Sequence, residues 1–348
     1  MSKRPSRSDT GPTIDYDTSK RLAQDADPRQ RLRVAGSPEV EPELLYFLAL
    51  DDDVEVRRTV AGNPAAPMQA SQVLVRDRDE SVRRMLAAKL ARALPDLNRD
   101  EHDRLFRHTV LMLEGLACDQ ALSVRAALAS SLKDVACAPP AVCRTLAHDA
   151  AREVAEPMLH YCAALPDEDL LALIASESRS WALDAVARRP SVSEPVSDAI
   201  YATGRETAII GLIENPGAAV SEPTLARMVE DSRQRTAWQL PLARRPRLPP
   251  GLALRLAGFV DEHVIEVLRR HPDLDPPTVA EVAEVTRRRL EFLRSQPSGQ
   301  PAEQHVRRLH AEGRLDEDAI GDALSWQDLD FVRLALALKA GLPLSVVA

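Results

Sequence analysis

Apolar residues recur at a helical spacing in short blocks along this chain. The blocks place apolar side chains at positions i and i+4, and sometimes i+8, as in Val56/Val60, Val82/Leu86/Leu90, Val124/Leu128/Leu132 and Val264/Leu268. This spacing puts the side chains on one face of an α-helix. Blocks of about ten residues are too short to form stable isolated helices. The pattern therefore predicts short helices that are held by packing against one another.

The polar positions of these blocks also repeat. An aspartate opens each of three copies, 26 residues after the previous one: Asp27, Asp53 and Asp79. In every copy an arginine follows four residues later and an alanine eight residues later. A fixed period of this size is typical of repeat proteins, in which each unit buries its apolar face only against its neighbours.

Prolines mark the ends of the predicted helices. Nine of them are expected to close the first helix of a two-helix unit: Pro38, Pro64, Pro95, Pro139, Pro166, Pro190, Pro216, Pro246 and Pro272. Proline disfavours helical geometry at the residue before it. A second helix follows each one, often with a further proline in its first turn, where an N–H has no helical partner. We predict an all-α solenoid, a superhelix of about nine short two-helix repeats, over residues 21–295.

The remaining segments break the repeat pattern. Residues 1–20 are polar and without periodicity, so we expect a disordered leader. A longer helix is predicted around Phe106 to Ala117, where the third unit carries an insertion, and another over about residues 277–294. Residues 296–302 are rich in Ser, Gly and Pro and read as a linker. Residues 303–348 are expected to form a small helical tail.

Composition narrows the class of protein. Hydrophobic residues make up 45% of the chain and aromatic residues only 3%, which favours close-packed helices over a sheet. The net charge of −8, from 45 basic and 53 acidic side chains, weighs against a dedicated nucleic-acid binder. No apolar run is long enough for a membrane span, and no secretory signal is apparent. The four cysteines form no C-x-x-C pair, and we expect a cytoplasmic protein.

The repeated unit resembles HEAT-like repeats. The resemblance is carried by Asp53 with Val56-Arg57, Asp79 with Val82-Arg83, and Asp119 with Val124-Arg125. With its helix-ending prolines and separate tail, the whole pattern is similar to a bacterial HEAT-like family catalogued as a domain of unknown function. That resemblance implies a binding scaffold. It also implies a structural ladder, in which each aspartate accepts N–H groups at a helix start and each arginine reaches the next unit's aspartate.

Three arginine pairs stand close before helix-closing prolines. They are Arg188-Arg189, Arg244-Arg245 and Arg269-Arg270. Equivalent positions of stacked units lie along one edge, so the pairs could form a basic stripe that binds carboxylates or phosphates. They could equally be cations that complement the ends of helix dipoles. Both interpretations stay open at this stage.

We expect a non-enzymatic scaffold that binds another protein, with an acidic or phosphorylated segment as the candidate ligand. The alternative is a nucleic-acid-binding HEAT-like protein that uses the arginine stripe. A more remote alternative is a HEAT-like lyase of the kind that attaches tetrapyrrole pigments to carrier proteins. No catalytic residue, metal ligand or cofactor is predicted, because the phosphate-loop, dinucleotide, zinc-protease and nucleophile-elbow motifs are absent. Cys143, His148 and Asp149 do not share a helix face well.

Overall fold

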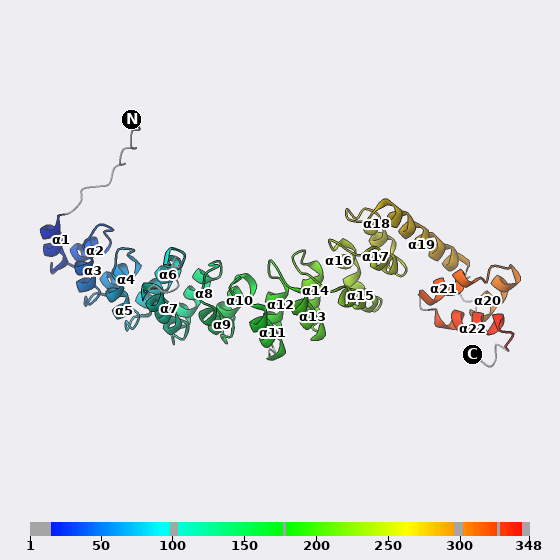
Figure 1. Cartoon of the computed structure of the whole chain (residues 1–348), viewed down its shortest axis with the longest axis horizontal. Helices are drawn as coiled ribbons and strands as arrows, with labels where there is room; N and C mark the ends of the chain where they lie inside the picture. The colour runs from blue at the N-terminus through cyan, green and yellow to red at the C-terminus, as the bar shows by residue number, and fades with distance from the viewer. Residues whose placement is uncertain (1–14, 98–103, 177–178, 296–301, 326–327, 343–348) are drawn as a thin grey trace, which may run out of the picture. The chain divides into compact units, whose positions relative to one another are not determined.

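Short helices in two alternating rows make up the protein. The computed structural model describes residues 15–97, 104–176, 179–295, 302–325 and 328–342. Within these ranges it contains 22 α-helices and one 3-10 helix but no β-strand, as predicted for an all-α solenoid (Figure 1). The predicted count of nine repeats stays a prediction. The chain divides into two compact units, Met1–Pro190 and Ser191–Ala348.

The first unit begins with α1 (Tyr16–Ala23) and continues as two rows. The first row contains α2 (Pro28–Ala35), α4 (Val54–Gly62), α6 (Glu80–Leu97), α8 (Leu122–Leu132), α10 (Arg152–Tyr161) and α12 (Ser180–Ala187). The second row contains α3 (Pro42–Leu48), α5 (Met68–Leu74), α7 (Arg104–Ala117), α9 (Pro140–Ala147) and α11 (Asp167–Ser176). Each first-row helix packs against the next first-row helix, which is the stacking expected of a solenoid.

The second unit has the same alternation of helices and ends in a tail. Its first row contains α14 (Glu206–Glu214), α16 (Gln239–Arg244), which follows the 3-10 helix η1 (Thr236–Trp238), and α18 (Glu262–Arg269). Its second row contains α13 (Glu194–Ala202), α15 (Glu222–Asp231), α17 (Pro250–Ala257) and the long α19 (Pro276–Ser295). The tail contains α20 (Ala302–Ala311), α21 (Glu317–Ser325) and α22 (Leu329–Lys339).

The apolar positions of the repeat pattern form the core. Val56, Val60, Val82 and Leu86 have no exposed surface, because the i, i+4 face of each first-row helix is covered by its neighbours. The tail has a core of its own around Val306 and buried residues of α22. None of the described helices combines the length and the apolar character that crossing a bilayer requires.

The start of the chain needs a correction. We predicted a disordered leader over residues 1–20, but α1 already begins at Tyr16. The reason is a helix cap: the Asp15 carboxylate accepts a hydrogen bond from the Thr18 N–H at 2.9 Å, and Ser19 is buried. Residues 1–14 of that leader, and residues 296–301 of the predicted linker, lie outside the described residues. The tail starts one residue earlier than predicted, at Ala302.

One predicted helix end is wrong. Pro95 lies inside α6, which continues to Leu97. A proline removes the hydrogen bond of its own N–H and crowds the preceding turn, yet here it stands in the last turn of a helix whose Leu90, Ala91 and Leu94 are buried. Packing of that apolar face outweighs the local cost of the proline.

Candidate partner-binding surface

Four ion pairs connect successive repeats of the first unit. In each, an arginine of one first-row helix donates from Nε to an aspartate in the loop before the next first-row helix. The pairs are Arg31–Asp51 and Arg57–Asp77 at 2.7 Å, and Arg83–Asp119 and Arg125–Asp149 at 2.6 Å. The carboxylate side chains are at most 9% exposed. Such shielded, bidentate contacts couple neighbouring repeats more strongly than surface ion pairs do. We call them the Asp–Arg ladder.

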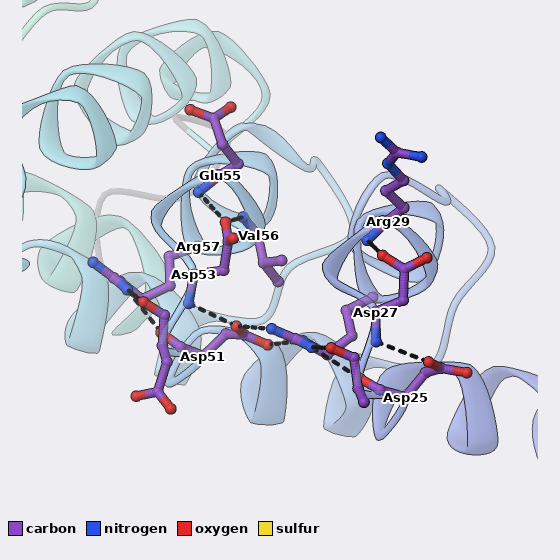
Figure 2. Close-up of polar contacts among 11 residues, drawn as sticks. Asp25, Asp27, Arg29, Asp51, Asp53, Glu55, Val56 and Arg57 are labelled. Carbon is purple, nitrogen blue, oxygen red and sulfur yellow. Dashed lines mark hydrogen bonds and ion pairs between the residues drawn. The ribbon is translucent and has the colours of Figure 1, made fainter.

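A second set of aspartates caps the helices. Asp53 accepts hydrogen bonds from the N–H groups of Glu55 and Val56 at 2.8 and 3.3 Å, as Figure 2 shows. Asp79 accepts the N–H of Ser81 at 2.8 Å in the same way. These contacts satisfy amide groups that have no partner within the helix.

We predicted that one aspartate per repeat would both cap the helix and accept the arginine. In the structure, two different aspartates have these two roles. The predicted ladder named Asp53, Arg57, Asp79, Arg83, Asp119 and Arg125. Of these acids, only Asp119 receives an arginine of the preceding repeat. The other arginine acceptors, which sequence reasoning missed, are Asp51, Asp77 and Asp149. The signal was present as an Asp-x-Asp doublet at residues 25–27, 51–53 and 77–79, because a capped helix start needs only one of the two acids.

Each ladder arginine also donates hydrogen bonds to the loop that precedes its own helix. The Nη1 group of Arg57 donates to the carbonyl oxygens of Asp51 and Asp52 at 2.7 and 3.0 Å, and Figure 2 shows Arg57 beside this loop. The hydrogen bond to Asp77 raises the pKa of the Arg57 guanidinium. For Asp119, burial raises the pKa, but the hydrogen bond from Arg83 and further contacts lower it more, so the net shift is downward. The ladder charges are thus neutralised within the array and are not available to a partner.

The ladder ends at Asp149. Each ladder arginine stands six residues after the aspartate of its own loop, but the position six residues after Asp149 is Ala155. Arg179 of the following repeat instead donates from Nη1 to the Asp149 carbonyl oxygen at 2.8 Å. A second kind of contact also joins successive repeats, and it does not depend on the ladder.

That second device is a side chain placed directly before a helix-closing proline. The Arg189 guanidinium donates to the Leu159 and Cys162 carbonyl oxygens at 2.6 and 2.8 Å. Arg245 donates to three carbonyl oxygens at and beyond the end of α14: Leu212 at 2.7 Å, Ile213 at 3.1 Å and Ala218. These carbonyls have no partner within their own helix or lie in the loop after it. We call this contact the pre-proline clamp.

An asparagine and a histidine occupy the same position in other repeats. The Asn63 amide donates to the Ala35 and Ser37 carbonyl oxygens at 2.7 and 2.9 Å. His271 donates from Nε2 to the Arg245 carbonyl oxygen at 2.9 Å, while its Nδ1 accepts the Asp273 N–H at 3.2 Å. These four clamps share a donor aimed at the end of the preceding first-row helix. Charge is not their common feature.

The clamps remove two arginines from the proposed arginine stripe. Arg189 and Arg245 are buried, and burial lowers the pKa of both guanidinium groups. Arg188, Arg244, Arg269 and Arg270 are exposed. The guanidinium groups of Arg269 and Arg270 both contact Glu266, at 3.5 and 2.7 Å. Within the described ranges, no carboxylate lies at ion-pair distance from Arg188 or Arg244.

Arg244 has a special position because it lines two neighbouring grooves of the second unit. The first, between α14 and α16, has a volume of about 220 Å³ and an apolar lining that includes Ile213 and Leu240. The second, between α16 and α18, has a volume of about 340 Å³ and is lined by Val267 and Pro272 together with His263, Glu266 and Arg270. We call them the α14/α16 groove and the α16/α18 groove. An exposed cation thus stands between two small recesses whose lining surface is more apolar than polar.

Cys143, His148 and Asp149, considered above as a possible catalytic group, each make separate structural contacts. Cys143 is fully buried, and the neighbouring Cys162 thiol together with burial raises its pKa. His148 directs Nδ1 at the Arg144 carbonyl oxygen, 2.9 Å away, and Asp149 is the last acid of the ladder. Across the described residues, no group of three or more potential metal ligands comes together.

Comparison with known proteins identifies the family to which the chain belongs. None of the curated proteins compared with the chain matches it. A family model described as "Uncharacterised protein conserved in bacteria (DUF2336)" matches residues 154–348, which is more than half of the chain. The matched segment starts in α10, where the Asp–Arg ladder ends and the arginine clamps begin, and it includes the tail. The chain therefore belongs to the DUF2336 family of bacterial proteins.

Proposed function

We propose that this protein is a cytoplasmic, non-enzymatic scaffold that binds another protein through its first-row surface. The observation that carries the proposal is Arg244, an exposed cation between two mostly apolar grooves and without a carboxylate at ion-pair distance among the described residues. Protein-binding sites typically combine apolar recesses with an arginine anchor. Stacked helical repeats offer such recesses at regular intervals along a surface.

The geometry favours a protein ligand over a nucleic acid. A duplex is held mainly by several cations that contact successive phosphates. Burial of Arg189 and Arg245 removes two of the six arginines that the stripe would need, and Arg269 and Arg270 share Glu266. Steep salt-dependent binding of the purified protein to random duplex DNA would revive the nucleic-acid alternative.

The test uses a photo-crosslinking amino acid at Val267, which lines the α16/α18 groove, in the bacterium that encodes the protein. We expect a covalent adduct with another protein that is lost in Arg244→Glu. The matched control is Arg84→Glu, which makes the same charge change at another exposed arginine of a first-row helix. A missing protein adduct, or one that persists unchanged in Arg244→Glu, contradicts the proposal.

A further inference from the structure

We infer that Arg244 and its two grooves bind one face of an amphipathic partner helix. Two apolar side chains of that helix, seven residues apart, enter the α14/α16 and α16/α18 grooves, and a carboxylate between them binds Arg244. This inference rests on the proposed scaffold function and adds to it the chemistry and conformation of the bound segment.

The size of the grooves limits what enters them. An α-helix with its side chains is about 10–12 Å wide, so recesses of about 220 and 340 Å³ take single side chains, not a whole helix. Their linings call for apolar side chains. Ile213, Leu240 and Pro241 line the first recess. Ala243, Val267 and Pro272 contribute to the second, whose lining surface is mostly apolar although His263, Glu266 and Arg270 also belong to it.

The charge between the grooves calls for an acid. The Arg244 side chain is exposed and lines both recesses, so it can reach a group that lies over the ridge of α16. A carboxylate pairs with guanidinium through two parallel hydrogen bonds. Glu214 lines the α14/α16 groove and Glu266 lines the α16/α18 groove. Both disfavour a further acid inside these recesses, which restricts the carboxylate to the middle of the ligand.

The spacing selects the conformation of the ligand. The two grooves lie on either side of α16, so their centres are separated by about one interhelix distance, roughly 8–10 Å. In a helix, residues i and i+7 share a face and are about 10.5 Å apart, with i+3 and i+4 between them on that face. In an extended strand, two anchors with a same-face residue between them span four residues, about 13 Å. In a polyproline helix, residues i and i+3 fit the distance, but no residue of the same face lies between them. Only the α-helix satisfies both the spacing and the central acid.

The experiment is a selection on the full chain with a displayed library of single helices, randomised at surface positions i, i+3, i+4 and i+7. A parallel library displays unstructured peptides of the same length. We expect enrichment of helices with apolar residues at i and i+7 and Asp or Glu at i+3 or i+4. Binding of the enriched helix, measured by fluorescence anisotropy, is expected to fall by about tenfold or more in Arg244→Glu and to stay unchanged in Arg84→Glu. Circular dichroism of both variants checks that the fold is intact.

The outcomes separate the two proposals. Arg244-dependent binders that are unstructured, rich in proline or without an acid overturn the helix inference and leave the scaffold proposal standing. A selection that gives no Arg244-dependent binder from either library overturns both. Replacing the central acid of the enriched peptide by lysine should abolish binding to the natural chain and restore part of it to Arg244→Glu. Failure of that charge exchange contradicts direct pairing with Arg244.

Discussion

Neighbouring repeats are held together by different contacts before and after α10. The earlier repeats are joined by the Asp–Arg ladder, in which a cation of one repeat and an anion of the next must both be present. In the later repeats, where no ladder pair is described, the α10/α12, α14/α16 and α16/α18 junctions have pre-proline clamps from Arg189, Arg245 and His271, whose acceptors are backbone carbonyl groups. The α2/α4 junction has both kinds of contact, because Asn63 is a clamp as well. A ladder contact can therefore be broken from either side, by mutation or by protonation. A clamp depends on a single side chain.

The largest effect is expected for the clamp. Arg245→Met removes the donor that three carbonyl groups at and beyond the end of α14 share, while the Leu212 carbonyl keeps the Asn215 N–H at 3.3 Å. Because hydrogen bonds from charged groups contribute more than neutral ones, we expect a loss of about 3 kcal/mol in the stability of the surrounding repeats. Repeat proteins can unfold in parts, so urea titration is combined with hydrogen exchange of α14 and α16. The neighbouring exposed Arg244→Met should change stability by less than about 0.5 kcal/mol. Equal losses in the two variants would contradict the clamp.

The ladder is expected to give a smaller effect per residue. Arg57→Met removes the pair with Asp77 and the donor to two loop carbonyls, and should cost about 2 kcal/mol. The adjacent Arg58 pairs with Glu55 at the surface, so Arg58→Met should cost less than about 0.5 kcal/mol. A double-mutant cycle of Arg57 and Asp77 by urea denaturation measures the coupling directly. A coupling energy near zero would mean that the ion pair orients neighbouring repeats but does not stabilise the fold.

Acid should separate the two regions. The folded-state pKa values of Asp119 and Asp149 lie below the usual value, since contacts from Arg83 and Arg125 outweigh burial. Their stabilisation is therefore present above about pH 3.9 and is lost as pH falls through the lower folded-state pKa. Arg245 and its carbonyl acceptors do not titrate in that range.

Hydrogen exchange, corrected for its intrinsic pH dependence, provides the measurement. Below about pH 4 we expect the ladder repeats around α8 to open before the clamp around α14 and α16. Asp119→Asn should reduce this acid sensitivity. Simultaneous opening of both regions would show that the ladder acids do not control it.

The smallest effect concerns Lys89, a half-buried cation in the ladder region that forms no ion pair with the residues that the structure describes. Lys89 lies 3.4 Å from both the Ala66 carbonyl oxygen and the Ser71 hydroxyl, and burial lowers its pKa to about 8. Its charged form thus opposes folding below pH 8, and this penalty fades as pH rises toward the unfolded-state value of about 10.4. At pH 7, Lys89→Met should leave stability unchanged or raise it by up to about 1 kcal/mol. Thermal melting at pH 7 and pH 10 should show that advantage shrinking; an advantage that grows with pH would contradict the burial effect.

Much of the architecture could be predicted because the core-forming signal is local. The spacing of Val56 and Val60, or of Val82 and Leu86, determines both the helix and its buried face. Pro95 shows where local reasoning fails. Its cost at the end of α6 is outweighed by the burial of Leu90 and Leu94, and such tertiary packing cannot be read from the residues beside it.

The contacts between repeats were harder to predict. The local sequence does not show whether an arginine near a helix-closing proline points to solvent or into the preceding repeat. Arg188 is exposed, whereas its neighbour Arg189 is buried. A positional signal did exist. Asn63, Arg189, Arg245 and His271 share only the ability to donate a hydrogen bond, so comparing donors rather than charges would have indicated a structural role.

The direction of the clamp has a consequence for how such arrays grow. Every clamp points backwards along the chain, from the end of one first-row helix to the end of the helix before it. A tandem duplication that copies one complete unit therefore copies a donor together with the acceptors for the next donor. The new unit is compatible with both flanking units at once, whatever side chain provides the hydrogen. Lengthening by whole modules needs no compensating mutation at the junctions, whereas an insertion of part of a module separates donors from acceptors.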